Sequence, residues 1–172
     1  MLEQTVIYAS VALLTGGLGL LAWIDFKTGY LPDSLQVALA FGAGVILVFG
    51  SPIGIGWKDA LLGAAINTAV YYSLRWIVSR AKGREAMGLG DVKLAAIGGL
   101  WLGPWALPYI MALSGCLTLA AVGLASAIKR RAMWRGEIPL GPGLAVGILA
   151  AYLAALAGVQ DIVAPAVFQS QF

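Results

Sequence analysis

The sequence contains no histidine, and this absence removes several kinds of catalytic site. Serine–histidine and cysteine–histidine nucleophilic catalysis both need a histidine base, and the HExxH zinc motif needs two histidines. The single cysteine, Cys116, has no partner for an internal disulfide, and its position inside an apolar run predicts a packing role. Any catalysis by this chain must therefore use other side chains.

Charged residues are also scarce. They make up 11% of the 172 residues, whereas about 25% is typical of a soluble domain. Hydrophobic residues make up 60%, and a small water-soluble fold could not hide that much apolar surface. The composition therefore predicts a protein that uses the lipid bilayer as its solvent. The basic residues lie in short loops between apolar runs, where membrane topology explains them, so no nucleic-acid partner is expected.

Six apolar segments predict six transmembrane helices in one all-α domain, residues 1–172. A helix that crosses the bilayer needs about 20 residues, with a range of about 17–25. Turn residues separate the segments, as at Gly103-Pro104. The expected helices cover residues 5–24, 35–49, 60–77, 92–102 with a possible extension to 107, 108–128 and 139–158.

The loops with lysine and arginine share one side of this arrangement. Loops 26–34, 79–90 and 129–137 carry basic residues, whereas Lys58 is the one basic residue expected on the other side. The positive-inside rule places the three basic loops in the cytoplasm. Both termini are therefore expected outside.

Two aspartates lie at the cytoplasmic edge of the predicted helices. Asp25 follows the first apolar run and Asp91 precedes the fourth. Structural roles are possible for each: Asp25 as a solvated helix end, although the macrodipole disfavours it there, and Asp91 as an N-cap. If the two helices are neighbours, the carboxylates can approach and share one proton. The ionised carboxylate could then activate water while the protonated one polarises a peptide carbonyl, with no metal or cofactor.

Three motifs, in order along the chain, resemble those of the type IV prepilin peptidases, which are GxGD aspartyl proteases. Residues 23–33, WIDFKTGYLPD, resemble the first-aspartate motif of that family. Residues 87–93, MGLGDVK, resemble the GxGD motif. Residues 138–144, IPLGPGL, resemble an Ile-Pro-Phe-Gly-Pro element, with Leu140 in place of phenylalanine.

The resemblance implies that Asp25 and Asp91 are the catalytic pair, and that Gly88 and Gly90 let backbone approach the pair or the substrate. It implies an endopeptidase of the bacterial inner membrane that cuts the short basic leader of prepilins or pseudopilins at the cytoplasmic face. Which of these proteins is the substrate stays open. Many members carry an additional N-terminal region with paired cysteines and N-methyltransferase activity. No such cysteine pair occurs here, so the peptidase core alone is expected.

Other polar residues have supporting or structural interpretations. Asp33 is expected to be the N-cap of the second helix. Lys93 could orient substrate, but extension of its ammonium group to the membrane interface, or a packing role, is favoured. Arg75 is also expected to reach the interface in this way, and Glu85 to be a solvated loop charge.

Three alternatives use the same residues differently. A small proton- or cation-coupled transporter could use Asp25 and Asp91 as an ion site. A structural membrane subunit could use them only as helix caps. A serine–lysine peptidase would need a pair such as Ser51 and Lys58 near the outer face.

Overall fold

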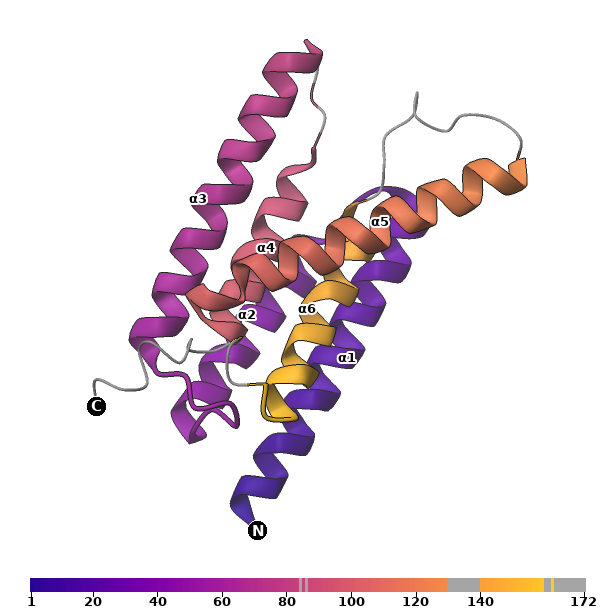
Figure 1. Cartoon of the computed structure of the whole chain (residues 1–172). Coiled ribbons are helices and arrows are strands. Elements are labelled where there is room, and N and C mark those ends of the chain that lie inside the picture. Colours follow the sequence, from indigo (N-terminus) through magenta and orange to yellow (C-terminus); the bar gives the residue numbers. More distant parts are fainter. Residues whose placement is uncertain (84, 86, 130–139, 160–161, 163–172) are drawn as a thin grey trace.

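The computed structural model describes residues 1–83, 85, 87–129, 140–159 and 162 of the chain. These residues form a bundle of α-helices, and no strand occurs among them, which confirms the all-α prediction. The helices, joined between α4 and α5 by the 3-10 turn η1 (Pro104–Ala106), are α1 (Leu2–Thr28), α2 (Asp33–Phe49), α3 (Trp57–Lys82), α4 (Leu89–Leu102), α5 (Leu107–Lys129) and α6 (Leu140–Leu156) (Figure 1).

The ends of α1 and α4 differ from the sequence prediction. Helix α1 continues four residues past the apolar run to Thr28, and the left-handed Gly29 (φ 65°) ends it. The Gly29 backbone N–H donates a hydrogen bond of 2.7 Å to the Asp25 carbonyl oxygen. Helix α4 begins at Leu89. Asp25 and Asp91 therefore lie within helical turns, not beside them.

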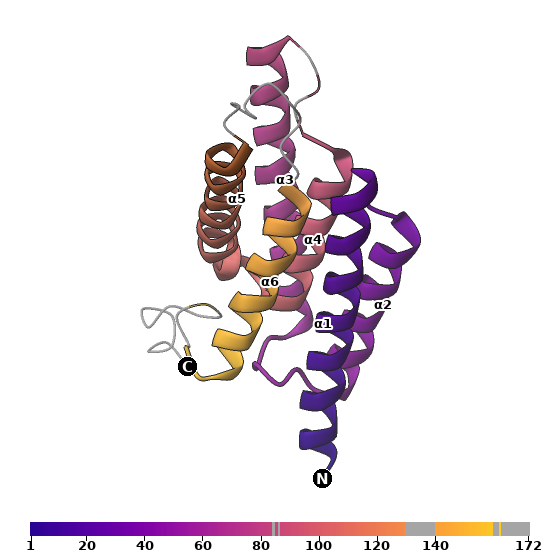
Figure 2. The ribbon, with the colours of Figure 1, turned by 90° about the vertical axis from the view of Figure 1, so that its right-hand side faces the viewer.

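One end of the bundle gathers the termini of several helices. In Figures 1 and 2, α1 and α3 run up to the end opposite the N-terminus, and α2, α4 and α6 begin there. This arrangement follows from short connections between consecutive antiparallel helices. The chain from Gly29 to Pro32, for example, is enough to turn α1 into α2. We refer to this end as the upper end.

Helix α4 lies at the centre of the packing. It contacts α3, α6 and α2, and α6 also packs against α1 and α5. Helices α1 and α4 share no extensive interface of their own. The hypothesis of direct packing between the first and fourth helices is therefore replaced by an arrangement in which α2 and α6 each contact both.

Glycine makes the closest helix contact possible. A Cβ atom on Gly63 of α3 would collide with the Gly99 carbonyl oxygen of α4, and one on Gly99 would collide with the Gly63 carbonyl. Small residues let backbones approach closely where helices pack in lipid. A side-chain hydrogen bond holds α4 on its other side, because Trp101 Nε1 donates to the Leu39 carbonyl oxygen of α2 at 3.1 Å.

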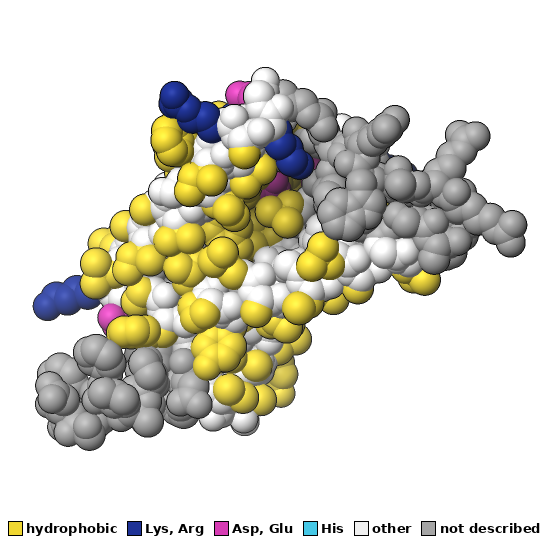
Figure 3. All heavy atoms as spheres, turned by 45° about the horizontal axis from the view of Figure 1, so that its top comes forward, with side chains coloured by type: hydrophobic (Ala, Val, Ile, Leu, Met, Phe, Trp, Pro, Cys, Tyr) yellow, Lys and Arg dark blue, Asp and Glu magenta, His cyan; other side chains and the backbone are white. Residues whose placement is uncertain are grey.

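The outside of the bundle is apolar, but the six-span prediction is not established. Large hydrophobic side chains are exposed on several helices, including Phe41 (74%) and Trp76 (57%). Figure 3 shows hydrophobic side chains over much of one face, with few charged ones. By length and composition, α1 and the segment Pro104–Ala121 can cross a bilayer. Helices α2 and α6 are apolar but have 17 residues each, and α4 has 14.

Candidate functional site

The two aspartates singled out from the sequence are both nearly buried at the upper end. Asp25, in the last turn of α1, is 7% exposed, and Asp91, in the first turn of α4, is 9% exposed. Both lie in helix turns at the same end of the bundle, where α1 ends and α4 begins. Burial of carboxyl groups is costly unless hydrogen bonds or proton sharing compensate, so two together mark this end as the candidate site.

The start of α4 holds Asp91 in a defined position. The helix N-cap is Gly88, which has extended backbone (φ −67°, ψ 148°), and Asp91 is the third residue of the helix. The Asp91 carboxylate lies beside this N-cap, with Oδ2 3.7 Å from the position that a Cβ atom on Gly88 would occupy, and it interacts with the Gly88 backbone N–H. The third helical residue is the position from which a side chain can reach the N-cap donor in a capping box. The alternative in which Asp91 is itself the N-cap is therefore wrong, because the N-cap is Gly88, three positions earlier.

Helix α6 packs against Asp25 through a glycine. A Cβ atom on Gly141 would lie 2.9 Å from Asp25 Cγ and would collide with Oδ2. Asp25 Oδ2 is buried without a hydrogen-bond partner among the described residues. The absence of a side chain at Gly141 thus leaves room for the Asp25 carboxylate. The sequence motif containing Gly141 was recognised, but its first two residues, Ile138 and Pro139, lie outside the described residues.

The loop after α1 connects the two aspartate segments. Leu31, which is 5% exposed, packs over the first turn of α4 at Gly90. A Cβ atom on Gly90 would lie 2.9 Å from Leu31 Cβ. Absence of a side chain at Gly90 therefore lets the loop of the first motif rest on the helix of the second.

Asp33 and Lys93 form an ion pair, and this corrects the expectation for Asp33. Helix α2 begins at Asp33 with Pro32 as its N-cap, and the Asp33 side chain makes no capping hydrogen bond. Lys93 Nζ instead donates to Asp33 Oδ1 at 2.7 Å, with both side chains about half exposed. The pair joins the starts of α2 and α4. Extension to the membrane interface alone does not account for Lys93, because its ammonium group is paired with Asp33.

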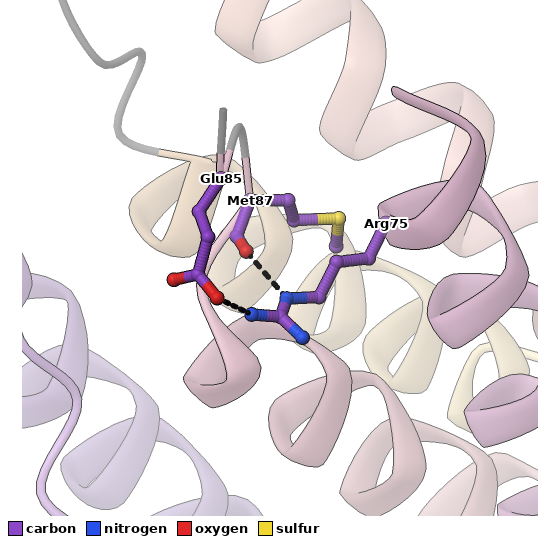
Figure 4. A network of polar contacts seen from close by, with 3 residues as sticks. All are labelled: Arg75, Glu85 and Met87. Atoms are coloured by element: carbon purple, nitrogen blue, oxygen red, sulfur yellow. Dashed lines mark hydrogen bonds and ion pairs between the residues drawn. The ribbon is translucent and has the colours of Figure 1, made fainter. Parts of the chain in front are cut away.

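Arg75 makes contacts that the sequence analysis did not predict. Its side chain is 17% exposed, and it turns toward the segment before α4 (Figure 4). Nε donates to the Met87 carbonyl oxygen at 2.8 Å, and a terminal nitrogen pairs with Glu85 Oε1 at 2.8 Å. Glu85 is 84% exposed and lies between α3 and α4, as expected of a solvated loop charge, and it also pairs with Arg75.

One polar residue at this end was missed by the sequence analysis. Gln36, in the first turn of α2, is 3% exposed. Neither atom of its amide has a hydrogen-bond partner among the described residues. A polar side chain within an apolar helix was the available signal, because such groups are costly in membranes.

The chain is thus an apolar helical bundle with two nearly buried carboxylates at one end. Residues 12–124 match the model of the type IV leader peptidase family. This segment contains both aspartates and most of the chain. The chain belongs to the type IV leader peptidase family.

Curated relatives agree with this assignment. A prepilin leader peptidase/N-methyltransferase of Aeromonas hydrophila is 38% identical over 134 residues, covering 78% of this chain and 45% of the relative. One of Burkholderia pseudomallei is 35% identical over 124 residues, covering 72% and 39%. A type 4 prepilin-like proteins leader peptide-processing enzyme of Escherichia coli O78:H11 is 32% identical over 148 residues, covering 86% and 52%.

The chain spans about half the length of these curated relatives. No solved structure matches it.

Proposed function

We propose that this chain is a membrane-embedded aspartic endopeptidase that cuts the short basic leader of prepilin-like or pseudopilin precursors. Membership of the leader peptidase family supports the class of substrate. The observation that carries the aspartic mechanism is the pair of nearly buried carboxylates, Asp25 and Asp91, at one end of the bundle. The relatives named above process prepilins or prepilin-like proteins.

The proposed chemistry needs the two carboxyl groups and one water. The ionised carboxylate removes a proton from water, whose oxygen attacks the scissile carbonyl carbon, while the protonated carboxyl donates its proton to the carbonyl oxygen. Collapse of the tetrahedral intermediate breaks the C–N bond, and a proton moves to the leaving nitrogen. Two adjacent carboxyl groups suit this division of roles, because they disfavour double ionisation.

We place the site at the cytoplasmic face of the bacterial inner membrane, with six helices in the bilayer and both termini outside. The apolar exterior supports the membrane location, because large exposed apolar surfaces are unusual on soluble proteins. Lys27, Arg80 and Lys82 lie in the last turns of α1 and α3, at the same end as the aspartates. This distribution supports a cytoplasmic upper end.

A site at the membrane edge suits a leader peptide better than an ion pathway. Each described acidic residue within a helix lies in its first or last turn. A transporter would need charged groups along a path between the two faces. At the cytoplasmic edge, by contrast, the scissile bond would lie where a basic leader meets an apolar helix.

The test is co-expression with a candidate prepilin, comparing wild type with Asp25→Asn and Asp91→Asn. Each variant should lose cleavage by about a hundredfold or more, the usual contribution of a general acid or base. Conversion of precursor to mature protein is measured by gel mobility and N-terminal sequencing. The new N-terminus should lie at the junction of leader and helix.

Asp59→Asn is the matched control. Asp59 is an exposed aspartate in the first turn of α3, at the opposite end of the bundle, and its replacement should leave cleavage unchanged. Unimpaired cleavage by either Asp25→Asn or Asp91→Asn would exclude the dyad. A cut within the substrate helix or on its outer side would contradict the orientation.

A further inference from the structure

Arg75 is the best-anchored cation among the described residues. Its guanidinium group makes two hydrogen bonds of 2.8 Å, to the Met87 carbonyl oxygen and to Glu85. Arg75 lies near the polar end of α3, beside Ser79, Arg80 and Glu85, and an ionisable residue in a membrane-protein helix is by default a candidate for a functional role. The proposed chemistry of the aspartates does not use it directly.

The contact with Met87 leads to Asp91 through one peptide group. The carbonyl that accepts from Arg75 belongs to Met87, and the N–H of the same peptide belongs to Gly88. That N–H interacts with the Asp91 carboxylate. Asp91 Oδ2 lies 3.7 Å from the position that a Cβ atom on Gly88 would occupy, so the carboxylate lies directly beside this residue.

We infer that Arg75 is a positioning residue for Asp91, acting through the single peptide group that joins Met87 to Gly88. A cation at the carbonyl end polarises the peptide and strengthens the interaction of its N–H end with the carboxylate, as in chains of hydrogen bonds generally. The guanidinium also fixes the plane of the peptide, because Nε and a terminal nitrogen bind two different acceptors on the same segment. The orientation of the Asp91 carboxylate then depends on α3 as well as on α4.

The inference rests on the proposed function, since it assigns Arg75 a role in the same reaction. Its test compares Arg75→Ala and Arg75→Lys with wild type. Arg75→Ala should lower kcat for prepilin cleavage about tenfold or more, as expected for loss of a hydrogen bond with charge, and leave KM nearly unchanged. Arg75→Lys should recover part of kcat, because an ammonium group can still donate to the Met87 carbonyl.

Chemical rescue separates a positioning role from a merely structural one. Arg75 lines a surface cavity of about 190 Å³ together with Tyr72, Trp76 and Arg80. A small solute can therefore reach the space left by the arginine side chain. Added guanidinium should restore kcat to Arg75→Ala, at concentrations that leave wild type unaffected.

Arg80→Ala is the matched control. Arg80 lies on the same helix and lines the same cavity, but it is exposed and stacks on Trp76 with its guanidinium carbon 5.2 Å from the ring centroid. Its replacement should leave kcat unchanged and unresponsive to guanidinium.

Amide hydrogen exchange gives a readout independent of activity. The Gly88 amide should exchange faster in Arg75→Ala than in wild type or Arg80→Ala. Wild-type kcat in Arg75→Ala would overturn the inference, as would a loss that follows thermal stability and resists guanidinium. Failure of the proposed function is distinguishable, because Asp91→Asn would then retain cleavage.

Discussion

At the residue scale, the absence of a side chain at Gly141 helps to set the position of the Asp25 carboxylate. The Asp25 carboxylate fills the space that any larger residue at position 141 would need. A buried carboxylate cannot simply turn outward, because its surroundings are packed and its Oδ2 has no room beside α6. The position of this carboxylate is thus set partly by a residue more than a hundred positions away in the sequence.

We expect Gly141→Ala to lower kcat by about tenfold to a hundredfold, since displacing a catalytic group by about 1 Å can cost that much. The added methyl group displaces the Asp25 carboxylate from its position near Asp91. Steady-state kinetics of prepilin cleavage in detergent or liposomes measures the effect.

Gly19→Ala is the control for Gly141→Ala. Gly19 is on the same helix as Asp25, and a Cβ atom there meets nothing within 4 Å. Alanine favours helix over glycine, so this variant should be fully active and no less stable. A wild-type value of kcat in Gly141→Ala would contradict the prediction, because it would show that the Asp25 carboxylate can move without any effect on cleavage.

The sequence was sufficient to find Asp25 and Asp91 as candidates but not the residues that hold them. Each aspartate adjoins an apolar run in a recognisable motif, so local pattern alone draws attention to it. Arg75 and Gly141, in contrast, act through contacts made by tertiary packing. Their local sequence carries no sign of these partners, which is why Arg75 was expected to extend to the membrane interface.

The contact between α3 and α4 depends on glycine at the scale of helices. Gly63 and Gly99 face each other so closely that a side chain on either would meet backbone of the other helix. Backbone cannot move aside as a flexible side chain can. The contact therefore fixes how near α3, with Arg75, lies to α4, with Asp91.

Gly99→Val should destabilise the protein by about 1–3 kcal/mol or more, as overpacking of a close contact does. Its Cβ atom would also lie 2.7 Å from Asn67 Nδ2, which is buried and bonded to the Gly63 carbonyl. Thermal unfolding in a mild detergent measures the change. Gly115→Val is the control, because a Cβ atom there meets nothing within 4 Å, and equal stability of the two variants would contradict the packing argument.

The sequence predicted the helices themselves, but it did not predict which helices pack against each other. Apolar runs separated by turn residues predicted six helices, and their bounds agree with the described helices to within a few residues except at the C-terminal end of α3. Helix α3 extends to Lys82 because its last turns are polar, so hydropathy could not reveal them. The central position of α4 depends on small residues meeting across helices, and a single sequence does not say which pairs meet.

At the scale of the whole molecule, the helices differ greatly in length. Helix α4 has 14 residues, whereas α1 has 27 and α3 has 26. At 1.5 Å per residue α4 is about 21 Å long, shorter than a hydrocarbon core of about 30 Å. In Figure 1 the top of α3 stands above the start of α4. The first turn of α4, which contains Asp91, therefore lies below the top of α3.

If the proposed function holds, we expect the short helix that carries Asp91 to make cleavage sensitive to hydrophobic mismatch. In the proposed arrangement the bilayer must thin around α4, and a thinner bilayer lowers that cost. We expect cleavage to be faster in liposomes of short-chain than of long-chain phosphatidylcholine, with Asp25→Asn giving the background in each. Equal rates across the series, or fastest cleavage in the thickest bilayer, would show that α4 does not set the local thickness. If cleavage is instead fastest in the thinnest bilayer, membrane composition regulates leader removal without any ligand.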